Sequence, residues 1–277
     1  MEYVSAGDAE IPALGVGTFQ LSGEQARETV TTALDLGYRH VDTAEYYDNE
    51  RAVGDAIARS SVDRDDVFLT TKVWRSHLSR EDVRPAVENS LDRLGTAYVD
   101  LLLIHWPHPR VPVAGTLDVM ETLRDEGLVE HIGVSNFTRS QLAEAIDVAD
   151  APIVTDQVLY HPFNDQRALG EFCVDDDVAL TAYSPLARGA VVGNDDLASI
   201  GDRHDKSAAQ VALRWLVQQE NVVAIPRSAS RDHLADNLDV FDFELTDAEM
   251  GRIDGLTGTL RVRLANQLPK LMRSFPL

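Results

Sequence analysis

Eight short apolar runs, rich in Val, Ile and Leu, recur along this chain at similar intervals. In chain order they are PALGVGTF, RHVDTA, VFLTTKVW, VDLLLIHW, HIGVSNF, IVTDQVLY, ALTAYSPL and VVAIPRS. Between them lie segments with apolar residues at helical spacing, such as EQARETVTTALDLG, REDVRPAVENSLDRLG and AAQVALRWLVQQ. Alternation of strand and helix predicts a parallel sheet, and eight units predict a closed (β/α)8 TIM barrel. An open doubly wound sheet is the alternative.

The continuity of this pattern predicts a single domain over residues 1–277. A chain of 277 residues is an ordinary length for one α/β barrel, and no linker rich in Pro, Gly or Ser interrupts the alternation. The opening YVSAGDAEIPAL contains two short β-like pieces around an Ala-Gly-Asp turn. We expect these pieces to form a hairpin that caps the floor of the barrel.

The charge balance is strongly acidic, with 46 acids against 25 bases and a net charge of −21. Only three bases are lysines, Lys72, Lys206 and Lys270. Nucleic-acid binding is not expected, because such binding requires basic residues that neutralise phosphates. The acidity and the scarcity of lysine suggest adaptation to high salt, where screening weakens self-repulsion and hydrated carboxylates maintain solubility. An ordinary acidic cytosolic protein is the alternative.

The cysteine count and the apolar runs indicate a cytoplasmic protein of a reducing compartment. Cys173 is the only cysteine, so no internal disulfide can form. The N-terminal segment has neither the basic start nor the apolar run of a signal peptide. No apolar run approaches the roughly 20 residues that a membrane-spanning helix needs.

Polar residues occupy the carboxyl ends of the predicted strands from the second run onward: Asp42, Lys72, His105, Ser135 with Asn136, Gln157, Tyr183 and Arg227. The first three are separated by about 30 residues each, the length of one strand-helix unit. They should therefore lie on neighbouring strands, about 4.8 Å apart. In a barrel this is the end at which active sites form.

Asp42 and Lys72 are expected to pair, because either charge alone would be costly to bury. A purely structural ion pair is the simplest interpretation of one Asp and one Lys. The presence of His105 and Tyr47 at the same end favours chemistry instead. We expect the Lys72 ammonium to lower the pKa of Tyr47, so that the phenol can donate a proton near neutral pH.

These residues resemble the aldo-keto reductases, barrel enzymes that reduce aldehydes and ketones with NADPH and have no Rossmann domain. The resemblance spans nearly the whole chain and is closest to short-loop microbial members such as diketogluconate and aldehyde reductases. It is carried by GVGTF at Gly15, DTAEYYDNE at Asp42, TTKVW ending at Trp74, LLLIHWP around His105, GVSNF at Gly133, AYSPL at Ala182 and IPRS at Ile225.

The resemblance implies a catalytic set of Asp42, Tyr47, Lys72 and His105. Tyr47 would protonate the carbonyl oxygen, Lys72 would lower the pKa of Tyr47, Asp42 would hold Lys72, and uncharged His105 would orient the carbonyl. Tyr47 matches the family's tyrosine by its spacing from Asp42, whereas Tyr46 is expected to pack.

The resemblance also implies a cofactor site. Ser135, Asn136 and Gln157 would contact the carboxamide and Tyr183 would stack on the nicotinamide. The pyrophosphate, 2′-phosphate and adenine would contact Ser184, Leu186, Pro226, Arg227, Ser228, Arg231, His233 and Asn237. A helix N-terminus after a late barrel strand is a suitable anion site.

This phosphate site departs from the family's pattern. Arg227 stands where lysine is usual and His233 where arginine is usual, so one permanent charge is missing, although Arg231 could replace it. Asp236 replaces a longer glutamate. We therefore predict NADPH as the cofactor, with appreciable use of NADH.

The substrate pocket is expected to include Phe19, Trp74, Trp106 and, at its rim, His108. The connection PHPRVPVAG after Trp106 is short, which favours small or accessible carbonyls. The tail from Thr259 to Leu277 carries Arg261, Arg263, Lys270 and Arg273 and no acid. By resemblance it would lie over the pocket, where it could attract anionic substrates; alternatively it docks on the acidic body.

Other functions fit the sequence less well. A metal hydrolase would need a carboxylate cluster near His105, His108 and His161, and none is present, so no metal is expected. GVSNF has Phe137 where a serine hydrolase would have glycine. The leading alternative is a non-catalytic, nicotinamide-sensing partner protein with the same fold. We expect no membrane partner and a monomer.

Overall fold

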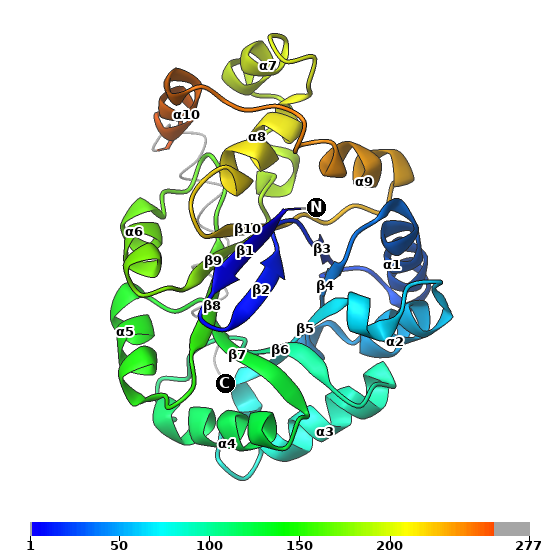
Figure 1. Cartoon of the computed structure of the whole chain (residues 1–277), viewed down its shortest axis with the longest axis vertical. Helices are drawn as coiled ribbons and strands as arrows, with labels where there is room; N and C mark the ends of the chain where they lie inside the picture. The colour runs from blue at the N-terminus through cyan, green and yellow to red at the C-terminus, as the bar shows by residue number, and fades with distance from the viewer. Residues whose placement is uncertain (1, 258–277) are drawn as a thin grey trace.

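The computed structural model describes residues 2–257 and consists of an antiparallel hairpin and an eight-stranded parallel sheet surrounded by helices (Figure 1). The hairpin strands are β1 (Tyr3–Ala6) and β2 (Ala9–Pro12). The sheet strands are β3 (Val16–Gly17), β4 (His40–Asp42), β5 (Phe68–Val73), β6 (Val99–Ile104), β7 (Val129–Ser135), β8 (Ile153–Leu159), β9 (Ala179–Tyr183) and β10 (Val222–Ile225). All eight predicted strands are present. The basic tail from Thr259 to Leu277 lies outside the described residues.

The sheet closes into a barrel. Its strands follow chain order from β3 to β10, and all neighbouring pairs are parallel. Leu14, just before β3, forms a parallel bridge with Ala224 of β10. The Gly15 N–H donates to the Ala224 carbonyl at 2.9 Å, and the Ala224 N–H donates to the Ala13 carbonyl at 2.9 Å. The (β/α)8 prediction is therefore confirmed, and the open sheet is excluded.

Helices lie around the outside of the barrel (Figure 1). They are α1 (Gly23–Leu36), α2 (Glu50–Arg59), α3 (Val83–Leu94), α4 (Val113–Asp125), α5 (Arg139–Val148), α6 (Arg167–Asp175), α7 (Asp195–Gly201), α8 (Ala208–Val217), α9 (Arg231–Leu238) and α10 (Asp247–Asp254). Short 3-10 turns are η1 (Glu45–Tyr47), η2 (Arg64–Asp66), η3 (Arg75–His77) and η4 (Ala187–Gly189). Two of these turns follow β4 and β5: η1 contains Tyr47, and η3 begins directly after Trp74.

The N-terminal hairpin covers the floor of the barrel, as the sequence predicted. Its strands pair from Tyr3 opposite Pro12 to Ala6 opposite Ala9. Gly7 occupies the turn with a φ of +57° and donates its N–H to the Asp177 carbonyl, just before β9 begins. Hairpin side chains join a small apolar cluster with barrel side chains, namely Ala6, Ala9, Ile11, Leu101, Leu103, Val154, Ala179 and Val223.

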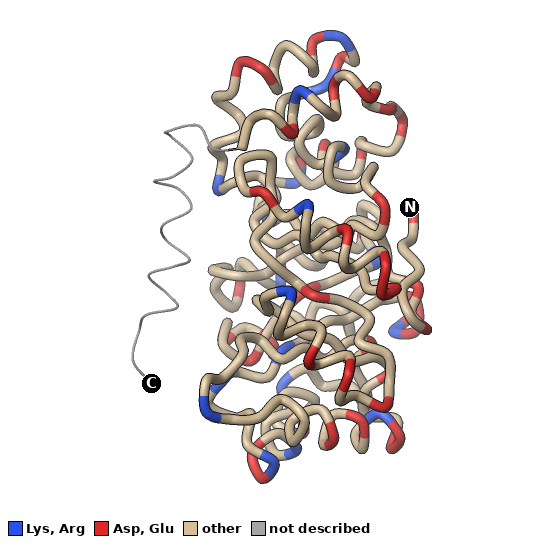
Figure 2. Tube along the Cα trace, turned by 90° about the vertical axis from the view of Figure 1, so that its left-hand side faces the viewer, with Lys and Arg blue, Asp and Glu red and all other residues tan. Residues whose placement is uncertain are grey.

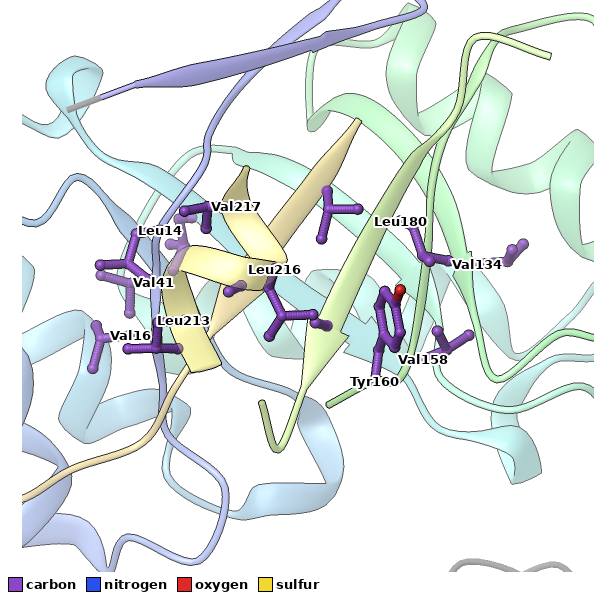
Figure 3. Packing of buried hydrophobic residues seen from close by; sticks show 14 of the residues in the cluster. Leu14, Val16, Val41, Val134, Val158, Tyr160, Leu180, Leu213, Leu216 and Val217 are labelled. Carbon is purple, nitrogen blue, oxygen red and sulfur yellow. The ribbon is translucent and has the colours of Figure 1, made fainter. Parts of the chain in front are cut away.

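The main hydrophobic core lies between the sheet and the helices. Figure 3 shows Leu213, Leu216 and Val217 of α8 in the same cluster as Val16 and Val41 of the neighbouring strands. Strands buried on both faces appear in the sequence as near-continuous apolar runs, which explains why the eight runs were recognisable. Full burial of one such side chain stabilises the fold by about 1.5–3 kcal/mol. This core fixes the strand ends on which the polar residues stand.

The surface carries acidic residues along many helices and loops (Figure 2). Several arginines form surface ion pairs with them, for example Arg84 with Glu126 and Arg252 with Asp196. Exposed pairs of this kind contribute little to stability individually. Among residues 2–257, no helix is long and apolar enough to cross a membrane, and no group of three or more His, Cys, Asp or Glu side chains could hold a metal ion.

Candidate active site

A buried ion pair joins two neighbouring strands at the carboxyl end of the barrel. Asp42 ends β4 and Lys72 lies near the end of β5, and these strands are paired in parallel. Lys72 Nζ donates to Asp42 Oδ1 at 2.6 Å and to the Thr43 carbonyl at 2.8 Å, and both side chains are almost fully buried. Burial lowers the pKa of Lys72, and the adjacent Asp42 opposes that shift. Removing one partner would leave an uncompensated buried charge.

Tyr47 contacts this pair from η1. Lys72 Nζ lies 3.4 Å from the Tyr47 hydroxyl oxygen and 5.0 Å from the ring centroid. We expected a lowered pKa for Tyr47 beside Lys72, but the net shift of its pKa is in the opposite direction. Burial raises the pKa of Tyr47 well above its ordinary value of 10.0, and the nearby Asp42 and Tyr183 raise it further. The charge of Lys72 is largely neutralised by its close contact with Asp42, which explains why burial prevails.

His105 completes the group from the third strand. It follows β6, and its backbone N–H donates to the Val73 carbonyl of β5 at 3.0 Å. Burial lowers the pKa of His105 well below its ordinary value of 6.5, and the Lys72 charge lowers it further. Its Nδ1 is buried and has no hydrogen-bond partner among residues 2–257. His105 is therefore an uncharged imidazole with its ring 5.6 Å from that of Tyr47.

The three predicted carboxamide contacts and Tyr183 form one hydrogen-bonded network on β7, β8 and β9. Gln157 Nε2 donates to Asp42 Oδ2 at 2.7 Å, and Ser135 Oγ donates to the Gln157 carbonyl at 2.8 Å. Asn136 Nδ2 donates to the His105 carbonyl at 3.0 Å, and the Tyr183 hydroxyl donates to Asn136 Oδ1 at 2.9 Å. The structure brings these four residues together. A carboxamide that bound to them would have to replace some of the hydrogen bonds that they make with one another.

The predicted dinucleotide residues lie on the loops that follow β9 and β10. After β9, Ser184 has a left-handed backbone with a φ of 50°, and Leu186 directly precedes η4. After β10, Pro226 is buried, Ser228 is partly buried, and Arg227 is exposed. The loops are neighbours because β9 and β10 are paired in parallel.

The start of α9 carries the remaining phosphate candidates. Arg231 and His233 are exposed. Ser230 caps the helix, and its side chain accepts from the His233 N–H. Asn237, the predicted adenine contact, is 3% exposed, and its Nδ2 is buried without a partner among residues 2–257.

Aromatic residues surround Tyr47 and His105. Phe19 lies 5.0 Å from Tyr47, and Trp74 lies 5.0 Å from His105 between ring centroids. Trp106, adjacent to His105, is partly buried. Tyr46 packs as expected, stacked on Trp74 at 4.0 Å with an interplanar angle of 19°, but it is also 55% exposed. The stack of Tyr46 and Trp74 therefore forms an accessible wall beside His105.

His108 is not placed with these aromatics by any contact that the structure shows. It lines a hollow of about 410 Å³ together with Pro107, Val111, Phe137 and Glu144. None of the four predicted catalytic residues lines this hollow. The placement of His108 at the rim of the substrate pocket stays a prediction.

Two acidic residues near the site were not singled out from the sequence. Glu45 in η1 accepts the Trp74 N–H, and its position between Asp42 and Tyr47 was the only available signal. Asp156 on β8 is 0% exposed, and its Oδ1 accepts the Phe137 N–H at 3.4 Å. Asp156 Oδ2 has no partner among residues 2–257, and burial raises the pKa of this carboxyl to about 8. The sequence signal for Asp156 was its place inside the largely apolar run IVTDQVLY.

A closed parallel barrel with this polar group at its carboxyl end defines a barrel enzyme. Comparison with known proteins specifies which kind. Residues 13–257 match the model of the aldo/keto reductase family, so the chain belongs to the aldo/keto reductase family. It is therefore an oxidoreductase of a family that reduces carbonyl compounds with nicotinamide cofactors.

Individual relatives agree with this assignment. The chain is 41% identical over 256 residues to a 9,11-endoperoxide prostaglandin H2 reductase of Trypanosoma cruzi, covering 91% of this chain and 90% of the relative. It is 40% identical to a glyoxal reductase of Bacillus subtilis, covering 91% of each. A crystal structure of a putative 2,5-diketo-D-gluconic acid reductase B superposes with a TM-score of 0.92 at 45% identity, covering 94% of this chain and 92% of that one.

Proposed function

We propose that this protein reduces small aldehydes or ketones to alcohols, with Tyr47 as the proton donor and NADPH as the preferred cofactor. The observation that carries the proposal is the contact of Tyr47 with the buried pair of Lys72 and Asp42, beside an uncharged His105. The names of the glyoxal reductase and of the putative 2,5-diketo-D-gluconic acid reductase B support a carbonyl substrate, and the glyoxal reductase supports a small one.

The proposed proton transfer follows from the charges of these residues. A bound reduced nicotinamide would supply a hydride to the carbonyl carbon. His105 would donate its Nε2–H to the carbonyl oxygen. Its buried Nδ1, which has no hydrogen-bond partner among residues 2–257, would then be the ring nitrogen without a proton. Tyr47 would give its proton to the developing alkoxide, which is a much stronger base than a phenolate. Lys72, 3.4 Å away, would stabilise the resulting phenolate, and Asp42 would hold Lys72 in place.

The protein's residues fit a nicotinamide dinucleotide. Polar side chains suited to an amide lie beside Tyr183, whose hydroxyl donates to Asn136 Oδ1, and Tyr183 is itself only partly buried. Two exposed arginines, Arg227 and Arg231, flank the start of α9, in a chain with a net charge of −21. Arginine side chains beside a helix N-terminus favour phosphate. We therefore assign the 2′-phosphate to this loop.

The test is the loss of nicotinamide absorbance when purified protein is mixed with an aldehyde and NADPH or NADH. Turnover with either cofactor supports a reductase. Cofactor binding without turnover of any aldehyde or ketone in a broad panel would instead favour a nicotinamide-sensing protein. Binding is measured separately, by quenching of tryptophan fluorescence, so that the two outcomes can be distinguished.

Replacing Arg227 with alanine should raise KM for NADPH by roughly tenfold or more, the usual effect of losing a hydrogen bond to a charged group. KM for NADH should rise by less than about threefold, since NADH has no 2′-phosphate. Steady-state kinetics with both cofactors measures this selectivity. His233→Arg should shift preference further toward NADPH because it adds a permanent charge.

Arg252→Ala is the matched control for Arg227→Ala, because Arg252 is an arginine on α10 that binds Asp196 on α7. It should leave the ratio of the two kcat/KM values unchanged. Equal effects of Arg227→Ala on both cofactors would refute the assignment of the 2′-phosphate to this loop.

We further propose that the acidic surface is an adaptation to high salt. Raising KCl from about 0.1 M to 1 M shortens the Debye length from about 10 Å to about 3 Å, which weakens repulsion among the surface carboxylates. The unfolding midpoint at pH 7 should therefore rise by several degrees in a thermal melt. The rise should be smaller near pH 4.6, the isoelectric point, where the net charge vanishes. A midpoint independent of KCl at pH 7 would exclude this adaptation.

A further inference from the structure

Glu45 connects two loops of the site through both oxygens of its carboxylate. It begins η1, two residues before Tyr47. Its Oε2 accepts the backbone N–H of Trp74 at 2.9 Å, and its Oε1 lies 2.6 Å from His77 Nδ1. The side chain is only 17% exposed. The carboxylate therefore joins the turn after β4 to the turn after β5.

The residues on either side of this connection form the aromatic wall. Tyr46, the next residue after Glu45, stacks on Trp74, whose own N–H Glu45 accepts. Trp74 contacts His105 edge to face at 5.0 Å, and Tyr46 lies 6.3 Å from His105 in the same orientation. The wall thus lies next to the imidazole that would hold the substrate carbonyl.

The hydrophobic core does not fix this wall. Tyr46 is 55% exposed and Trp74 is partly buried. η1 ends at Tyr47 and is followed by Asp48, whose left-handed backbone, with a φ of 54°, stops the turn. A half-exposed stack on two short turns is ordered more firmly when a polar contact joins the turns. Glu45 provides two such contacts to the β5–α3 loop, one with Trp74 and one with His77.

We propose that Glu45 is a positioning residue that fixes the wall of Tyr46 and Trp74 and thereby favours carbonyl substrates with a planar aromatic group. An aromatic ring beside the reacting carbonyl can pack against the exposed ring of Tyr46 in an offset stack. A small aliphatic carbonyl lacks this contact and depends only on His105 and Tyr47. This inference rests on the proposed carbonyl reductase activity.

The test compares an aromatic aldehyde, 4-nitrobenzaldehyde, with a small dicarbonyl, methylglyoxal. Glu45→Ala should raise KM for the aromatic aldehyde roughly tenfold, the size of a lost stacking contact, with little change in kcat. KM for methylglyoxal should change by less than about twofold, since it has no ring to stack. Glu45→Gln should retain most of the wild-type selectivity, because its amide oxygen can still accept the Trp74 N–H.

Two controls separate this role from a general effect on the fold. Glu10→Ala removes a glutamate that accepts from Ser5 on the hairpin, and it should leave both KM values unchanged. His77→Ala removes the partner of Glu45 Oε1 but keeps the bond to Trp74, so its effect on the aromatic aldehyde should be smaller than that of Glu45→Ala. Tryptophan emission should also change in Glu45→Ala, because Trp74 loses its fixed stacking partner.

The outcomes distinguish the inference from the function on which it rests. If the wild type reduces neither aldehyde nor any other carbonyl, the proposed function fails. If the wild type is active and Glu45→Ala affects both substrates equally, or lowers kcat rather than raising KM, the positioning role is overturned while the reductase assignment remains.

Discussion

Tyr47→Phe is expected to lower kcat for carbonyl reduction by about 10²–10⁴-fold, the range that general acid catalysis contributes. The substitution removes only the hydroxyl that would protonate the carbonyl oxygen and keeps the ring packed 5.0 Å from Phe19. The unfolding midpoint should therefore change little. Single-turnover absorbance measurements, combined with cofactor binding by fluorescence, would show that the variant still binds cofactor but does not react.

Tyr46→Phe is the matched control for this variant. It removes the same hydroxyl from the adjacent tyrosine and keeps the ring stacked on Trp74. Its loss of kcat should be at least a hundredfold smaller, because the Tyr47 proton donor is intact. A larger loss in Tyr46→Phe than in Tyr47→Phe would show that the proton donor is assigned to the wrong tyrosine.

The pH profile of the wild type tests the same donor. Tyr47 must be protonated to act, and its pKa is raised above 10.0, so this requirement is met until the pH passes that raised value. His105 must be uncharged, and its pKa is lowered well below 6.5, so this requirement is met above that lowered value. We expect kcat for reduction to be flat between about pH 6.5 and pH 10. A fall in kcat centred near pH 7 would contradict the raised pKa of Tyr47.

Asp156→Asn is expected to stabilise the protein, and to do so increasingly as the pH rises from about 4 to 8. The folded state binds a proton at Asp156 with a pKa of about 8, whereas an unfolded aspartate has an ordinary pKa of 3.8. Between these values the folded state retains a proton that the unfolded chain loses, so the wild type loses stability as the pH rises. Asparagine has no proton to lose and can still accept the Phe137 N–H.

The size of this effect follows from the separation of the two pKa values. Each pKa unit corresponds to about 1.4 kcal/mol, so the advantage of asparagine could reach about 6 kcal/mol above pH 8. At about 2 °C per kcal/mol for a chain of this size, the unfolding midpoint would rise by up to about 12 °C. Near pH 4 the two proteins should melt almost together.

Asp175→Asn, an exposed aspartate at the end of α6, is the control for Asp156→Asn. It should produce no stability difference that grows between pH 4 and pH 8. Chemical denaturation at several pH values provides the same comparison by a second method. Parallel pH dependence in the wild type and Asp156→Asn would show that the pKa of Asp156 is not raised in the folded protein.

The apolar runs and the polar residues that end them were sufficient to predict the barrel and to place the candidate site residues at one end of it. Strands buried on both faces must be nearly all apolar, so eight such runs separated by amphipathic helices specify a parallel barrel. Because each strand-helix unit has about the same length, the polar residues that end the runs meet at one end of the barrel. The spacing of Asp42, Lys72 and His105 along the chain therefore predicts adjacent strands, as the pairing of β4, β5 and β6 confirms.

The pKa values of these residues and the neighbours that orient them depend on the three-dimensional packing. A side chain's pKa depends on its burial and on charges from other segments, so the raised pKa of Tyr47 could not be derived from its proximity to Lys72 in the strand order. The same holds for the buried carboxyl of Asp156 and for the contacts of Glu45, whose partners Trp74 and His77 lie on the next turn of the barrel. Spacing along the chain fixes which strand a residue occupies, whereas solvation and side-chain direction depend on how the loops pack.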